Sequence, residues 1–209
     1  MTDTEPNRRP IAARGSAWAR ALAGMLGRSA VTPNEISVAS VAFAAAGAAF
    51  LAWWPTWAGL LLCAVCIQLR LICNLIDGMV AVEGGRQSPL GKLYNEFPDR
   101  VADSLLIVAA GYACGWPWLG WLGALLAALT AYVRVFGGAL GFAQDFRGPL
   151  AKQQRMAVLT AGCVLGSLET LWHADRFALL AAAIIIAGGA LVTCATRTHA
   201  IAAQLRAAG

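Results

Sequence analysis

Three long stretches of the 209-residue chain contain no charged side chain. They cover positions 36–69, 104–133 and 177–196. A helix of about 20 apolar residues crosses the hydrocarbon core of a bilayer, so each stretch is long enough for at least one membrane span. Within lipid, a helix satisfies all of its backbone hydrogen bonds internally. The sequence therefore predicts an all-α integral membrane protein.

The overall composition supports the same fold class. Hydrophobic residues make up 59% of the chain and charged residues 13%, whereas soluble domains are about 25% charged. This composition excludes an ordinary soluble enzyme, a nucleic-acid-binding module and a disordered protein. The net charge of +5 is spread over loops and membrane edges, so it does not indicate nucleic acid as a partner. The six cysteines lie in apolar segments and indicate neither a disulfide framework nor a zinc site.

Turn-forming residues divide the apolar sequence into six expected transmembrane helices, between about 33 and 197, in a single membrane domain over residues 1–209. Thr32, Pro33 and Glu35 form a capping-box pattern at the start of the first helix. The expected spans cover about 33–54, 57–81, 88–115 and 117–140, then a fifth that ends near 172 and a sixth over about 176–197. A polar loop containing Lys152 and Arg155 is expected before the fifth span.

Residues 1–30 are expected to form a cytoplasmic, juxtamembrane segment. Trp18, Leu22, Met25 and Leu26 share one face of a helix, which predicts an amphipathic helix on the membrane surface. The arginines of this segment would face anionic lipid.

Basic residues and tryptophans mark opposite sides of the expected membrane domain. Three basic residues, Arg70, Arg100 and Arg134, lie within or at the edge of spans. Of the remaining basic residues, only Arg176 lies on the side of the tryptophan-rich turns. Because basic loops stay in the cytoplasm, both termini and the loops after the second and fourth spans are expected there. The small size and the Ala- and Arg-rich composition favour a bacterial inner membrane.

Polar side chains inside the spans gather near the cytoplasmic ends of the second and third spans. Such groups are costly in a membrane and are usually functional. A rise of 1.5 Å per residue, counted from the connecting loop, places Asn74 level with Asp99 and Arg70 level with Asp103. The simplest interpretation of the second pair is a buried ion pair. Around Asp77 and Asp99, oxygen ligands from two helices suit a hard cation such as magnesium, and a carboxylate there could take a hydroxyl proton.

The segment around this cluster resembles the signature of the CDP-alcohol phosphatidyltransferase family. The spacing of all eight signature positions is matched, and five identities are kept: Asp77, Gly78, Ala81, Gly91 and Asp99. Asn74 and Asn95 stand where the signature has aspartates, and Val82 stands where it has arginine. The run from Thr32 to Asn34, the Tyr132-Val133-Arg134 triplet, and Lys152 with Arg155 extend the resemblance over most of the chain.

The resemblance implies a phospholipid-biosynthetic transferase that moves a substituted phosphate from a CDP-linked lipid to an alcohol and releases CMP. It also implies one or two divalent cations, Mg or Mn, an active site on the cytoplasmic side, and a possible homodimer. Asp99 would be the catalytic base. The metal ligands would be Asn74, Asp77, Asn95 and Asp99. The residues that contact the nucleotide or phosphate groups would be Gly78, Ala81, Gly91, Arg134, Lys152 and Arg155.

The departures from the signature leave several alternatives open. Two asparagines remove two negative charges, so the site could hold two cations, one or none. Compensation could come from Glu83, Glu96 or Asp103 for the missing carboxylates and from Arg86 for the missing arginine. A relative that binds CDP-lipid or nucleotide without turnover is the alternative function. A small transporter would explain charges within the membrane but not the matched spacing. The sequence does not choose among acceptors such as glycerol phosphate, inositol phosphate, serine, choline and phosphatidylglycerol.

Overall fold

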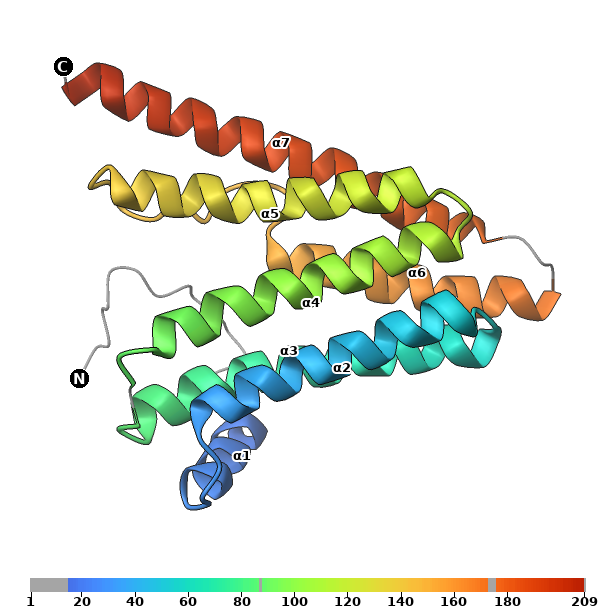
Figure 1. Cartoon of the computed structure of the whole chain (residues 1–209), viewed down its shortest axis with the longest axis horizontal. Helices are drawn as coiled ribbons and strands as arrows, with labels where there is room; N and C mark the ends of the chain where they lie inside the picture. Colours follow the sequence, from blue (N-terminus) through green and yellow to red (C-terminus); the bar gives the residue numbers. More distant parts are fainter. Residues whose placement is uncertain (1–14, 87, 173–175, 209) are drawn as a thin grey trace.

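The structure is a computed structural model that describes residues 15–86, 88–172 and 176–208. Within these ranges it contains seven α-helices and no strand, which confirms the predicted all-α class. The helices are α1 (Ala17–Gly27), α2 (Pro33–Trp53), α3 (Trp57–Glu83), α4 (Gly91–Ala113), α5 (Pro117–Ala139), α6 (Lys152–Trp172) and α7 (Phe177–Ala208). The six longer helices follow the long axis of an elongated bundle, and the short α1 lies at an angle to them (Figure 1).

Four helices in the described part of the chain are long and apolar enough to cross a membrane: α2, α3 over Trp57–Val82, α5 and α7. The helices α4 and α6 have similar lengths, 23 and 21 residues, but their sequences are more polar. They pack among the apolar helices, α4 against α2 and α5, and α6 against α3 and α7. The apolar helices indicate a membrane protein, whereas the number of six spans stays a prediction.

The capping box expected at the start of α2 is present. The Thr32 hydroxyl accepts a hydrogen bond from the Glu35 backbone N–H at 3.3 Å, and the Glu35 carboxylate accepts one from the Thr32 N–H at 2.7 Å. The start of α4 differs from the expected boundary, because Ser88 and Pro89 form a turn that precedes the helix at Gly91. The expectation that Lys152 and Arg155 lie in a loop is wrong, because α6 begins at Lys152.

The short helix α1 forms where the sequence predicted a helix, and Leu22 and Leu26 of the expected apolar face pack against the apolar cluster with α3, whereas Trp18 and Met25 of that face do not. Ala19 and Ala23 are buried against α3, whereas Trp18 is 50% and Met25 64% exposed. The small alanine side chains allow α1 to approach α3 closely. The location of α1 on a membrane surface stays a prediction.

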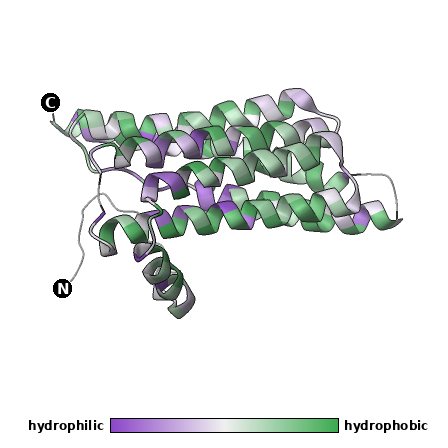
Figure 2. Ribbon diagram, turned by 60° about the horizontal axis from the view of Figure 1, so that its bottom comes forward, coloured by the Kyte–Doolittle hydropathy of each residue, from purple (hydrophilic) through white to green (hydrophobic). Residues whose placement is uncertain are grey.

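Polar residues are not spread evenly through the bundle. The turns 54–56 and 114–116 lie at one end, and residues 84–86, 88–90 and 140–151 lie at the other end with the last turns of α7 (Figure 1). Hydrophilic residues gather inside the half of the bundle next to these loops, while the remaining half is largely apolar (Figure 2). The apolar core between the helices includes Leu51, Leu60, Ile67, Leu106 and Leu159, all fully buried.

The backbones of α4 and α5 touch near their connecting turn. A Cβ atom on Gly111 would lie 2.6 Å from the Cα of Gly120, and one on Gly120 would lie 2.8 Å from the carbonyl oxygen of Val108. Since both obstacles are backbone atoms, no side-chain rotation can relieve the clash.

We therefore expect Gly120→Ala to lower the free energy of unfolding by about 1–3 kcal/mol, the usual cost of overpacking. The measurement is the thermal unfolding midpoint of the purified protein in detergent. Gly188→Ala in α7 is the matched control, because a Cβ there meets no atom within 4 Å. Equal midpoints for the two variants would contradict the close contact between α4 and α5.

Candidate active site between α2, α3, α4 and α6

Asp77 is a buried carboxylate on α3 that is held by a side chain from α2. The Ser37 hydroxyl donates a hydrogen bond to Asp77 Oδ2 at 2.5 Å, and the backbone N–H of Gly78 donates one to Oδ1. Both Ser37 and Asp77 are 5% exposed. Among the side chains that the structure describes, no Lys or Arg forms an ion pair with Asp77. Sequence reasoning missed Ser37, because nothing in its spacing links it to a carboxylate 40 positions later.

Asp99 on α4 contacts polar groups from α3 and α6. Its Oδ1 accepts a hydrogen bond from the Asn74 side-chain amide at 2.9 Å and lies 3.5 Å from Arg70. Its Oδ2 forms an ion pair with the Lys152 ammonium at the start of α6, and Arg100 lies 3.9 Å away. The predicted alignment of Asn74 with Asp99 is confirmed. Lys152, predicted only as a phosphate contact, is in fact joined to the same cluster.

Asp103 lies one turn further along α4, between two buried guanidinium groups. Arg70 donates a hydrogen bond to Asp103 Oδ1 at 2.6 Å, and Arg155 donates one to Oδ2 at 2.8 Å. All three residues are no more than 2% exposed. Arg155 also donates to the Thr130 hydroxyl at 3.2 Å and to the Leu150 carbonyl at 3.0 Å. This group, called the Asp103 triad below, links α3, α4, α5 and α6. The predicted Arg70–Asp103 pair is therefore confirmed, and Arg155 is its unexpected third member.

Arg134, at the same end of α5, connects that helix to α4 and to the following loop. It donates hydrogen bonds to Glu96 and Gln144, and its guanidinium lies 5.3 Å from the ring centre of Phe146. Glu96 is therefore already paired with a cation. A second arginine, Arg197 on α7, donates to the backbone carbonyls of Arg147 at 2.8 Å and Thr130 at 2.6 Å.

The loop that follows α5 has its own ion pair. Arg147 Nε lies 3.0 Å from Asp145 Oδ1. Partial burial acts to raise the pKa of Asp145, but hydrogen bonds from Arg147 outweigh it and hold that pKa below its usual value.

The small residues of the signature border open space. A Cβ atom at Gly78 or at Gly91 would meet no atom within 4 Å, and Ala81 is half-buried. Asn95 is exposed on α4 and is not among the hydrogen-bond partners of Asp77 or Asp99. The structure thus brings Asn74, Asp77 and Asp99 together, with Asn95 outside this buried group.

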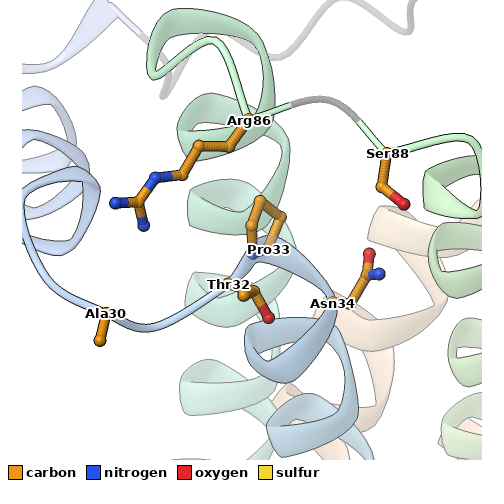
Figure 3. Close-up of a pocket in the computed structure, with 6 residues that line it drawn as sticks. All are labelled: Ala30, Thr32, Pro33, Asn34, Arg86 and Ser88. Carbon is orange, nitrogen blue, oxygen red and sulfur yellow. The ribbon is translucent and has the colours of Figure 1, made fainter.

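A cavity of about 370 Å³ opens at the start of α2, one turn before Ser37. Figure 3 shows Asn34 and Ser88 pointing toward one another across it, while Arg86 extends toward the connection between α1 and α2. Arg86 donates hydrogen bonds to the backbone carbonyls of Ser29 at 2.8 Å and Val31 at 3.1 Å. The loop after α3 is thus fastened to the segment before α2.

The donors of this cluster are of the kind that hard divalent cations bind. Asp77 lies close enough to Asp99 for the two carboxylates to interact electrostatically, and the Asn74 side-chain amide and the Ser37 hydroxyl each bond to one of them. No group of three His, Cys, Asp or Glu suited to a metal ion occurs in the described part of the chain. The reason is that asparagine occupies two of the four signature positions. Two carboxylates with neutral oxygen donors still fit a divalent cation.

We expect Asp103→Asn to lower the free energy of unfolding by about 3–5 kcal/mol, because it leaves the buried Arg155 without its carboxylate and Arg70 with only the more distant Asp99, 3.5 Å away. Thermal unfolding in detergent measures the effect. Asp145→Asn is the matched control, since Asp145 pairs with the mostly exposed Arg147 and its loss is expected to change stability little. A midpoint for Asp103→Asn as high as that of the control would argue against the triad as a stabilising element.

Two curated proteins are similar to this chain over most of their length. Archaetidylinositol phosphate synthase of Aeropyrum pernix is 35% identical over 187 residues, which cover 88% of this chain and 90% of that protein. Phosphatidylinositol phosphate synthase of Mycobacteroides abscessus is 26% identical over 195 residues, which cover 86% of this chain and 81% of that protein. No family model matches the chain.

Solved structures of phosphatidylinositol phosphate synthase from Mycobacterium tuberculosis have the same fold. The structure with CDP-DAG bound has a TM-score of 0.74 at 16% identity and covers 89% of this chain and 94% of the relative. The structure in complex with manganese and citrate has a TM-score of 0.72 at 17% identity and covers 88% of each chain. Sequence identity, coverage and fold agree: this chain belongs to the CDP-alcohol phosphatidyltransferase family, and it is a phospholipid-biosynthetic enzyme that transfers a substituted phosphate from a CDP-linked lipid to an alcohol with release of CMP.

Proposed function

We propose that the alcohol acceptor of this enzyme is an inositol phosphate. The two curated relatives are named for different lipid groups, archaetidyl and phosphatidyl, but both are named as synthases of a lipid-linked inositol phosphate. The inositol phosphate group shared by these two product names is the observation that carries the proposal. The donor would be a CDP-linked lipid of either kind.

The reaction would take place at the cluster of Asn74, Asp77 and Asp99. We assign these three residues to a divalent cation, magnesium or manganese, which would neutralise part of the diphosphate charge when bound. A relative of the same fold is in complex with manganese, and a second structure of it holds CDP-DAG. Asn95 lies four residues before Asp99 on the same face of α4 and would add an amide ligand from the exposed side.

The chain's own side chains would carry the proton and orient the substrates. The acceptor hydroxyl oxygen forms a bond to the lipid-linked phosphorus, the bond between that phosphorus and the CMP oxygen breaks, and the hydroxyl proton passes to the Asp99 carboxylate. Lys152, which forms an ion pair with Asp99, and Arg134, which forms one with Glu96, would contact phosphate groups. Arg155 already forms an ion pair with Asp103, so we propose that it positions α4 and does not contact a phosphate group.

The small signature residues would accommodate the nucleotide. The open space beside Gly78 and Gly91 leaves room for a ligand, and Ala81 lies one turn beyond Gly78. Arg86 does not take over the role of the missing signature arginine, because its guanidinium is hydrogen-bonded to the connection between α1 and α2. We assign it to the wall of the cavity shown in Figure 3.

The identity of the acceptor is tested by measuring CMP release from CDP-diacylglycerol and from CDP-archaeol with each candidate alcohol. Each assay contains manganese, magnesium or a chelator. We expect release with inositol phosphate and not with glycerol phosphate, serine or free inositol. Asp99→Ala should lower the rate by about 100-fold or more, the usual contribution of a general base. Asp145→Asn, outside the cluster, is the control.

Two results would count against these assignments. Release that depends on a different alcohol would overturn the acceptor, and full activity of Asp99→Ala would overturn the base. Binding of CDP-lipid without release under any condition would favour a non-catalytic relative.

We also propose that the six long helices all span a bacterial inner membrane, with both termini and the polar cluster on the cytoplasmic side. The arginine-rich end of the bundle and the tryptophan-rich turns support this orientation. Alkaline phosphatase, which is active only outside the cytoplasm, would be fused after Pro55 and after Gly85. We expect activity only for the first fusion, and the reverse pattern would invert the topology.

A further inference from the structure

The charge of Asp99 is already neutralised by cationic groups of the protein. Lys152 binds its Oδ2, and Arg70 lies 3.5 Å from its Oδ1, which also accepts the Asn74 hydrogen bond. The side chains of Asp99 and Lys152 are only 12% and 16% exposed, so solvent screens this pair weakly. Lys152 is the first residue of α6, and its flexible stem carries a compact positive charge into the cluster.

Asp77 is different, because its oxygens contact neutral donors. The Ser37 hydroxyl and the Gly78 backbone N–H orient the carboxylate without cancelling its charge. Lys152 is near enough to interact with Asp77 electrostatically, but it is bonded to Asp99. Within the described side chains, Asp77 is thus the carboxylate of this site whose charge is left for a metal ion.

We propose that this active site binds one divalent cation, anchored by Asp77, and that the Lys152 ammonium on Asp99 supplies the second positive centre. A second divalent ion would have to share two carboxylates with the first ion and with a buried ammonium, and like charges at short distance repel strongly in a weakly screened site. Lys152 would then supply, next to the cation, positive charge for a diphosphate. This inference rests on the proposed function, because it assigns the cation of that same site.

The number of bound ions can be measured without turnover. We would titrate the full chain in detergent with Mn²⁺ and follow free Mn²⁺ by electron paramagnetic resonance. We expect one Mn²⁺ per chain. Asp77→Asn should weaken binding at least about tenfold, because it removes the one carboxylate that carries no cation.

The variant Lys152→Met distinguishes the contribution of the lysine ammonium from that of the metal ion. It should tighten Mn²⁺ binding about tenfold, because a neighbouring positive charge is removed, while CMP release falls. Lower CMP release without tighter Mn²⁺ binding would instead indicate a lysine that only supports the fold. Arg206→Met is the matched control, because it removes one positive charge at the exposed end of α7 and should leave Mn²⁺ affinity unchanged.

Two Mn²⁺ ions in the unmodified chain, or none, would overturn the proposal, and so would an unchanged affinity in Lys152→Met. If that variant does not fold, Asn74→Asp offers a second route: an added negative charge beside Asp99 should tighten Mn²⁺ binding, and unchanged binding would count against the proposal. Failure of the proposed function has a different readout, since it would appear as absent CMP release whatever the Mn²⁺ count.

Discussion

The buried carboxylate of Asp103, held between Arg70 and Arg155, is the contact on which the arrangement of the site depends. It joins α3, α4 and α6 in one place, and through Thr130 it reaches α5 as well. Charged groups inside an apolar bundle are stable only when they are paired, so the three helices cannot slide past one another without separating these charges. Asp99 and Lys152 lie one turn away on the same helices, and their contact depends on the alignment that the Asp103 triad sets.

Part of this site could be predicted from the sequence. Arg70 and Asn74 precede a short loop, and Asp99 and Asp103 follow it, so equal counts of helical rise place the partners at equal depth. That argument is local to one pair of helices, and the hydrogen bonds Asn74–Asp99 and Arg70–Asp103 confirm it. The capping box at Thr32 is likewise local and is confirmed.

The contacts that sequence reasoning missed reach beyond the pair α3 and α4. Ser37 is on α2, and Arg155 and Lys152 are on α6. A count of helical rise along α3 and α4 does not determine which other helix packs beside Asp77 or Asp103. The expectation of a loop before the fifth span had the same origin. Charged residues at 152 and 155 look like loop residues in the sequence, but in the structure they belong to a helix whose charges are paired inside the bundle.

The packing of α1 has a consequence for how the site is supported. Ala19 and Ala23 belong to one apolar cluster with Leu75, Ile76, Met79 and Val80, the residues of α3 on either side of Asp77. The helix that carries Asp77, the carboxylate we propose as a metal ligand, is therefore supported on two sides, by Ser37 of α2 through a hydrogen bond and by α1 through apolar contact. Removal of α1 would therefore expose the apolar residues of α3 that lie on either side of Asp77.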